Sequence, residues 1–216
     1  VLATFRLFTM NDAIYMVCHH SIVNSLLVRL HMFVIRADVT FRTRSELTVM
    51  GLSEPTKLGR FPKPTWCQTG PAWPKECYAH LEPIQPAQLI VVPVSGAIEF
   101  IEATEGNTTL LDSDYWNLLQ IRHGIASVTA STSGLFTPQN LNLDLISGVS
   151  FTKGCYPGQE IVARLRYLGR VKQRLLRGRI QGPGEVRVGQ SVSLDDTRDK
   201  KVGVIVNASE IGRAHV

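Results

Sequence analysis

Residues 148–164 read GVSFTKGCYPGQEIVAR, the stretch of the chain that carries the most specific chemistry. Glycines flank the thiol of Cys155, and Lys153 precedes it. The Pro-Gly pair that follows predicts a helix beginning within residues 156–160, with Pro157 in its first turn. The unpaired N–H groups of that helix and the ammonium of Lys153 would both favour the thiolate of Cys155. Cys155 is therefore a candidate reactive thiol, and a buried, inert cysteine in a tight turn is the alternative.

The composition is that of a globular chain. Its 216 residues are 44% hydrophobic and 19% charged, so the chain can bury a core. No run reaches the ~18 apolar residues of a membrane span, and residues 1–17 lack the pattern of a signal peptide. Four scattered cysteines favour a reducing cytoplasm over a disulfide scaffold. Because the chain begins at Val1 without methionine, we expect it to be a fragment of a longer protein.

The positive charge is concentrated near the carboxyl end. From Lys153 onward there are 13 basic and 6 acidic residues, a net charge of +7, whereas residues 1–152 carry −2. One run of basic residues contains no acidic residue: Arg164, Arg166, Arg170, Lys172, Arg174, Arg177 and Arg179. Such a run predicts a face for a polyanion, either a phosphate backbone or a polyglutamate tail. A solvated face with no binding role is the alternative, and because no RNA-recognition aromatic residues are interleaved with the run, no direct reading of RNA sequence is expected.

The amino-terminal pattern predicts an α+β unit. Residues 1–8 and 13–18 alternate around a turn at 9–12, which is typical of a β-hairpin. Ser21 is a candidate N-cap for a helix over residues 22–32, and a strand is expected over residues 33–41. This order predicts a small antiparallel sheet with a helix.

The rest of the chain alternates between regular and irregular segments. Seven prolines between residues 51 and 86 predict an insert without regular structure, followed by a strand over 87–93. The segment Asp112-Ser113-Asp114 is a candidate cap for a helix through residues 115–121 that ends at Gly124, and a turn is expected at 136–139. Beyond Arg170, four short β-like segments predict a partial β-barrel: 174–180, 185–188, 191–194 and 202–206.

No metal site is predicted. His19 and His20 are adjacent and would point to opposite faces of a strand, which suits no single ion. Cys67 and Cys77 lack the further closely spaced ligands that zinc requires.

Three segments carry a resemblance to a known family. Residues 148–164 resemble the K-G-C-Y-x-G-Q-E signature of the YgfZ-type folate-binding proteins, also called tRNA-modifying proteins. Residues 136–143, FTPQNLNL, resemble that family's F-x-P-Q-x-x-N-L stretch, and residues 116–125 resemble its W-x-x-x-x-I-x-x-G-I segment. The resemblance is strong over about residues 115–174 and absent from the proline-rich insert. These proteins are similar in fold to the aminomethyltransferase (T-protein) of the glycine cleavage system.

The resemblance implies an aminomethyltransferase-like folate-binding fold and a division of the chain. Residues 1–93 would form an α+β subdomain with the insert at 51–86, residues 94–170 the folate-binding subdomain, and residues 171–209 the partial barrel. Residues 210–216 resemble the translation of a sequencing adapter and are expected to be an artefact tail.

The resemblance also implies a function. It predicts a tetrahydrofolate-binding scaffold, more a binding protein than an enzyme, that supports assembly or repair of iron–sulfur enzymes and thereby thiomethylation of tRNA. Cys155 would be a redox or cluster-handling thiol. The residues implied to bind the cofactor are Trp116, Lys153, Tyr156, Gln159 and Arg164.

Each of these implications has an alternative. Trp116 would stack on the flat folate ring, or else be a core aromatic of an amphipathic helix. The protein would instead be a folate-dependent one-carbon transferase like the T-protein, or a tRNA-binding module without folate that makes weak contact through residues 164–179. The location would be the cytoplasm, or the mitochondrion in a eukaryote.

Overall fold

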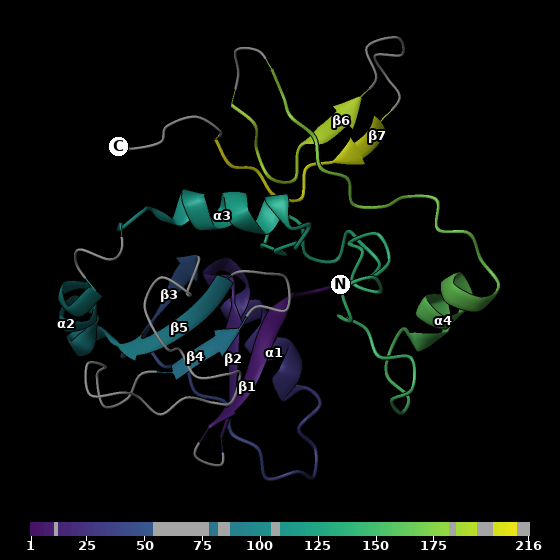
Figure 1. Cartoon of the computed structure of the whole chain (residues 1–216). Coiled ribbons are helices and arrows are strands. Elements are labelled where there is room, and N and C mark those ends of the chain that lie inside the picture. The colour runs from purple at the N-terminus through teal and green to yellow at the C-terminus, as the bar shows by residue number, and fades with distance from the viewer. Residues whose placement is uncertain are drawn as a thin grey trace. The chain divides into compact units, whose positions relative to one another are not determined.

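The chain divides into two compact units. The computed structural model describes residues 1–10, 13–53, 78–81, 87–104, 109–181, 185–193 and 201–210 (Figure 1). Unit 1 comprises Val1–Arg6, Met16–Ile35 and Asn117–Val216, and unit 2 comprises Leu7–Tyr15 and Arg36–Trp116. Each unit is therefore assembled from segments far apart in the sequence.

Unit 2 is built on a three-stranded antiparallel sheet. Its strands are β3 (Leu47–Ser53), β4 (Tyr78–Leu81) and β5 (Ala87–Pro93), in the order β3-β5-β4. The strand predicted over residues 87–93 is confirmed. Strands β3 and β4 correct the expectation that residues 51–86 lack regular structure, because β3 extends to Ser53 and β4 lies inside that range. Neither strand contains a proline, so each backbone N–H remains available for pairing.

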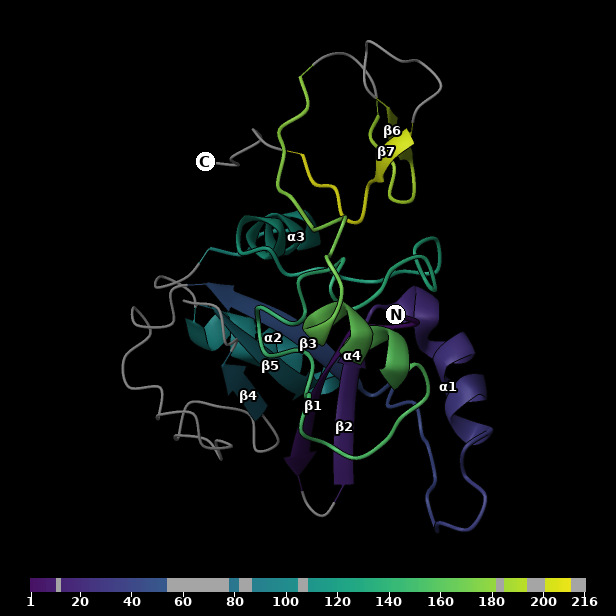
Figure 2. The same ribbon diagram turned by 90° about the vertical axis from the view of Figure 1, so that its right-hand side faces the viewer.

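The core of unit 2 lies between this sheet and helix α2 (Val94–Thr104), which the sequence pattern did not predict. Ile90 and Val92 of β5 are fully buried against Phe100 of α2. Figure 2 shows the strands of this sheet with α2 beside them. All four residues from Leu89 to Val92 are buried, as expected of a central strand covered on both faces. Pro93 ends this run, and the next residue begins the helix.

The amino-terminal hairpin is confirmed. Strands β1 (Phe5–Met10) and β2 (Ala13–Cys18) pair in a two-stranded sheet, and the rings of Phe8 and Tyr15 stack with their centroids 5.2 Å apart. A short 3₁₀ helix, η1 (His20–Ile22), leads into α1 (Val23–His31). The helix predicted over residues 22–32 is therefore confirmed almost over its length.

Two details after the hairpin differ from the sequence prediction. Ser21 does not cap α1, because η1 intervenes and the capping position falls to Ile22. Instead, the Ser21 hydroxyl accepts a hydrogen bond from the backbone of Ala130 at 3.0 Å. The strand predicted over residues 33–41 is also absent from these described residues. The N–H groups of Phe33 and Val34 bond back to α1, at 3.0 and 3.2 Å, and so turn the chain away from an extended path.

The remaining described elements follow the insert. Helix α3 (Ser113–Arg122) begins as predicted, because Asp112 accepts the N–H of Tyr115 at 3.1 Å, and it ends before Gly124, whose φ is +69°. Helix α4 is Gln159–Tyr167, and β6 (Ser191–Ser193) pairs with β7 (Lys201–Val204). The core of unit 1 gathers Ala126, Val128, Leu141 and Val206.

The carboxyl-terminal barrel is not formed by the described residues. Two of the four predicted segments overlap β6 and β7, whereas residues 174–180 and 185–188 form no strand. The side-chain amides of Asn140 and Asn142 bond the carbonyls of Gln173 and Leu175, both at 3.0 Å, where a neighbouring strand would otherwise pair. The helices and small antiparallel sheets confirm the α+β class, while the aminomethyltransferase-like fold stays a prediction. Residues 211–216 of the expected tail lie outside the described residues.

Candidate functional site

The signature segment forms a turn that ends in helix α4. Gly158 caps the helix with a φ of +84°, a left-handed conformation that glycine adopts without strain. The helix therefore begins at Gln159, so Pro157 precedes the cap and does not lie in the first turn as predicted. The field of a helix acts most strongly within its first turn. Cys155 stands four residues before Gln159 and therefore lies outside that turn.

Three predicted site residues come together in this turn. The Lys153 ammonium lies 4.4 Å from the centroid of the Tyr156 ring, a cation–π contact. The Gln159 side chain reaches back, so that its Oε1 accepts the N–H of Tyr156 at 3.3 Å. This bond spans three residues like the return bond of a capping box, but it joins the first helical residue to a residue that precedes the Gly158 cap. Lys153, Tyr156 and Gln159 thus form one small cluster, and Arg164 lies further along α4, exposed.

The described chain contains two free thiols in different surroundings. Cys155 is exposed, which excludes the alternative of a buried cysteine. Cys18 at the end of β2 is half-buried, and this burial raises the pKa of its thiol. Only Cys155 therefore offers an accessible sulfur in the signature turn. Cys67 and Cys77 lie outside the described residues.

Trp116 lies on α3 and packs on the sheet of unit 2. A Cβ placed on Gly51 of β3 would stand 2.1 Å from Cε3 of the indole, so the indole occupies the space that a side chain would fill. Trp116 is half-buried. Unit 2 contains Trp116, whereas the signature turn belongs to unit 1.

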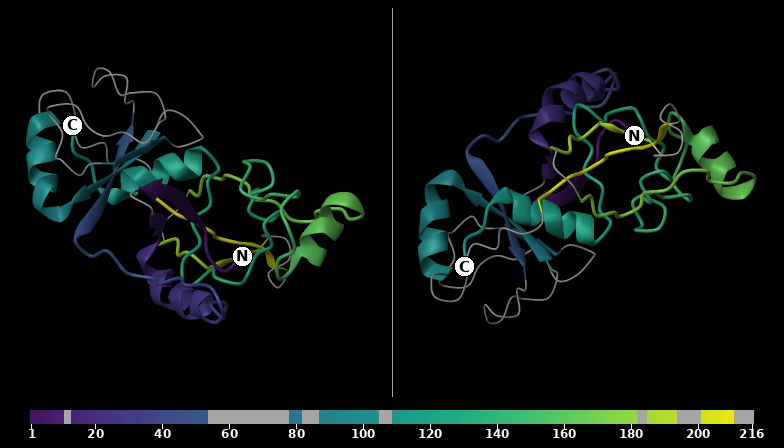
Figure 3. Two further views of the ribbon diagram at one scale, coloured as in Figure 1. Left: turned by 90° about the horizontal axis from the view of Figure 1, so that it is seen from below. Right: turned by 90° about the horizontal axis from the view of Figure 1, so that it is seen from above.

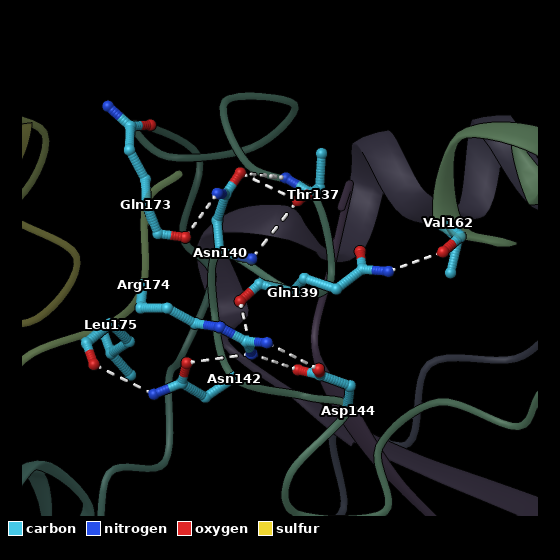
Figure 4. Close-up of polar contacts among 9 residues, drawn as sticks. All are labelled: Thr137, Gln139, Asn140, Asn142, Asp144, Val162, Gln173, Arg174 and Leu175. Atoms are coloured by element: carbon cyan, nitrogen blue, oxygen red, sulfur yellow. Dashed lines mark hydrogen bonds and ion pairs between the residues drawn. The ribbon is translucent and has the colours of Figure 1, made fainter. Parts of the chain in front are cut away.

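A polar cluster that the sequence did not predict connects the turn at residues 137–144 to the basic run (Figure 4). Arg174 binds Asp144 through two hydrogen bonds, Nη1 to Oδ1 at 2.7 Å and Nη2 to Oδ2 at 3.0 Å. The same Nη1 also donates to the carbonyl of Gln139 at 3.2 Å and to Oδ1 of Asn142 at 3.4 Å. Arg174 is thus bound within the protein and does not belong to an open polyanion-binding face.

Gln139 fastens helix α4 to this cluster. Its side chain is 1% exposed, and Nε2 donates to the carbonyl of Val162 at 2.7 Å (Figure 4). Val162 is itself buried, on the inner side of α4. Within the described residues the Gln139 Oε1 has no hydrogen-bond partner, although it is buried. Gln139 lies in the FTPQNLNL stretch, which the sequence singled out only as part of the family resemblance. Its role in holding α4 could not be predicted, because it depends on a contact with Val162, 23 positions away.

The other six basic residues of the run are exposed, and two of them also make contacts within the protein. Arg177 donates to the carbonyl of Arg122 at 3.0 Å, and the Arg166 guanidinium lies 3.9 Å from the centroid of the Phe151 ring. The other four exposed residues are Arg164, Arg170, Lys172 and Arg179. The basic run is therefore not one uniform face.

The described residues contain neither a membrane-spanning helix nor a metal-binding cluster. None of their helices is both long and apolar enough to cross a membrane. Within the same residues, no three His, Cys, Asp or Glu side chains gather where they could hold a metal ion.

Comparisons with known proteins identify relatives over part of the chain. A protein of Colwellia psychrerythraea named tRNA-modifying protein YgfZ is 47% identical over 90 residues, which cover 41% of this chain and 25% of the relative. Proteins of Yersinia pestis and Yersinia pseudotuberculosis with the same name are 40% identical over 87 residues, 40% of this chain and 26% of each relative. No protein-family model matches the chain.

These relatives form a single class, proteins named for the modification of tRNA. The chain is a relative of the YgfZ-type proteins, and the resemblance predicted from its signature is confirmed. The chain spans about a quarter of the length of the curated relatives that it matches.

Proposed function

We propose that this protein is a tetrahydrofolate-binding accessory protein that supports iron–sulfur enzymes and, through them, the thiomethylation of tRNA. The observation that carries the proposal is the 47% and 40% identity to relatives named tRNA-modifying proteins. The signature residues supply the specific chemistry. The proposed location is the cytoplasm, or the mitochondrion if the source is eukaryotic.

Two features support folate as the ligand. Folate combines a flat ring system with a carboxylate tail, so its site needs an aromatic surface and a cation. Within unit 1, the signature turn supplies both, the half-buried ring of Tyr156 and the exposed ammonium of Lys153 beside it. Gln159 holds Tyr156 in place, and the exposed Arg164 is a second cation for a polyglutamate tail. These aromatic and cationic side chains are of the kinds that folate requires.

The test is a titration of the chain with tetrahydrofolate, in which binding is measured by calorimetry and by tryptophan fluorescence. Stacking on an aromatic ring is worth about 0.5–1.5 kcal/mol beyond area burial, so Trp116→Ala should weaken binding about 2- to 12-fold. Trp116→Phe keeps a ring and should lose less. Tyr115→Ala, on the neighbouring position of α3, is the matched control and should bind as the wild type does. Equal affinity of wild type and Trp116→Ala would remove Trp116 from the site.

The exposure of Cys155 supports a role as a redox or cluster-handling thiol. In cells that depend on this chain for tRNA thiomethylation, Cys155→Ser should lower the thiomethylated fraction, measured by mass spectrometry of tRNA nucleosides. Cys18→Ser is the control for a thiol that is half-buried outside the signature turn. Full thiomethylation with Cys155→Ser would leave the residue no chemical role.

A further inference from the structure

Helix α4 and its C-cap residue Leu168 expose several large side chains. Tyr167 is 68% exposed, Leu168 is 87% exposed and Ile161 is 60% exposed, although all three are large and apolar or aromatic. In both views of Figure 3, no other helix or strand of the described part of unit 1 covers the outer side of α4. We call the surface formed by Phe151, Arg164, Arg166, Tyr167 and Leu168 the α4 face.

Cations and aromatic rings are interleaved on the α4 face. The Arg166 guanidinium carbon lies 3.9 Å from the centroid of the Phe151 ring and 5.8 Å from that of Tyr167. Phe151 stands 15 positions before Arg166, so the sequence run itself did not show this pairing. A guanidinium held beside two rings presents flat surfaces on which a nucleobase can stack. Tyr167 lies inside the basic run and Phe151 joins it through the fold, which argues against the expectation that no RNA-recognition aromatic residues are interleaved with the run.

The charge around this face suits a chain of phosphates. Arg164 lies on α4, and Arg170 and Lys172 follow in the irregular segment after it, all three exposed. No acidic residue occurs between Glu160 and Glu185, so no neighbour in sequence neutralises these cations. A backbone of phosphates is attracted to such a series, while unpaired bases stack on aromatic rings and guanidinium planes.

We propose that the α4 face binds unpaired nucleotides of an RNA. A base stacks on Tyr167 and on the Phe151–Arg166 pair, and Arg164, Arg170 and Lys172 bind the flanking phosphates. A paired duplex gains little from the rings, because its bases are already stacked inside the helix. The inference rests on the proposed function, which makes tRNA the relevant RNA, and deepens it by assigning the contact to unpaired nucleotides.

The experiment measures fluorescence anisotropy of two labelled RNAs with the full chain: a stem–loop with an unpaired loop and a fully paired duplex of equal length. The wild type should bind the stem–loop more tightly. Stacking of one base is worth about 5- to 150-fold in affinity, so Tyr167→Ala should weaken stem–loop binding by that factor and leave duplex binding nearly unchanged. Tyr167→Phe, which keeps the ring, should restore most of the loss.

A second variant tests the phosphate contacts. Arg164→Gln should weaken binding of both RNAs and reduce the slope of log affinity against log salt by about 1, measured between about 50 and 200 mM salt. The matched controls are Tyr115→Ala, a tyrosine on the surface of another helix, and Arg187→Gln, an exposed arginine paired with Glu185. Both controls should bind RNA as the wild type does. Circular dichroism of each variant establishes that it is folded.

Three results would overturn the inference. They are unchanged stem–loop affinity for Tyr167→Ala, equal wild-type affinity for stem–loop and duplex, and no RNA binding by the wild type. A loss of tetrahydrofolate polyglutamate binding in Tyr167→Ala, with RNA binding unchanged, would assign the face to folate instead. The folate titration with Trp116→Ala concerns unit 2, so its outcome is independent of these results.

Discussion

At the scale of single residues, Gly51 has no side chain and thereby leaves room on β3 for the indole of Trp116. The indole of Trp116 occupies the space next to the Gly51 backbone, 2.1 Å from where a Cβ would stand. Glycine in the middle of a strand weakens the strand, and such a position often marks a close approach by another group. Here the approaching group is the tryptophan that the resemblance implies for folate binding.

Gly51→Ala should therefore destabilise the protein and displace the indole. Overpacking of a fitted contact costs about 1–3 kcal/mol in the free energy of unfolding, which urea denaturation measures. The tryptophan emission maximum should shift as well. Gly178→Ala is the control, because a Cβ there would meet no atom within 4 Å. If Gly51→Ala is as stable as Gly178→Ala, the indole does not rest on β3.

The two described cysteines should differ in reactivity toward iodoacetamide. Cys155 is exposed, whereas Cys18 is half-buried and burial raises the pKa of its thiol, which reduces its thiolate fraction at neutral pH. We expect Cys155 to be alkylated first, and Cys18 to react appreciably only at higher pH. Peptide mass spectrometry over a series of pH values gives both rates, with urea-unfolded protein as the reference. Equal rates in the folded protein would contradict the difference in surroundings.

At the scale of elements, the Asp144–Arg174 pair joins the turn at 137–144 to the segment that follows α4. The Asp144 side chain is 12% exposed and that of Arg174 is 32% exposed, so the pair is partly removed from water. Gln139 adds a second link, from the same turn to the carbonyl of Val162 on α4. The signature helix is therefore positioned by a turn that precedes it in the sequence.

Arg174→Ala should cost much more stability than the loss of an exposed arginine. It leaves the Asp144 carboxylate partly buried without its partner, which costs about 2–3 kcal/mol. Arg187→Ala is the matched control, because Arg187 and Glu185 are about three-quarters exposed and such a pair contributes about 0–1 kcal/mol. Urea denaturation measures both free energies of unfolding. A similar cost for the two variants would mean that Arg174 is a surface residue.

At the scale of the whole molecule, the stability of the chain should depend on His19. Its Nδ1 accepts the N–H of Ser21 at 3.3 Å and so caps η1. Burial, assisted by the neighbouring charge of His20, lowers the pKa of His19. The unfolded chain then binds the proton more tightly, so this contribution to stability is present above the unfolded pKa of about 6.5 and is lost as the pH falls through the folded pKa.

His19→Asn should flatten this part of the pH profile. Asparagine keeps a hydrogen-bond acceptor for the cap but does not titrate. The free energy of unfolding, measured from about pH 8 to pH 5, should fall less for the variant than for the wild type. An identical fall in both proteins would show that His19 does not couple protonation to folding.

Local patterns predicted several elements because each depends on residues close together in the chain. The hairpin β1–β2 follows from alternation around a short turn, and β5 from an apolar run that ends at Pro93. Helix α3 follows from its Asp112 cap and terminal glycine. The prediction was wrong at residues 33–41, where bonds back to α1 outweigh the β propensity of the segment.

By itself, the sequence determined the relation to the YgfZ-type proteins, the α+β class and the signature turn with its helix, because motif and local periodicity are properties of neighbouring residues. Only the tertiary structure decided which cations are bound and which are exposed. Arg174 meets Asp144 across 30 positions, and Arg166 meets Phe151 across 15. The charge of each residue is evident from the sequence. The partner of a charged side chain depends on the fold, because contacts between distant residues form only when the chain is packed.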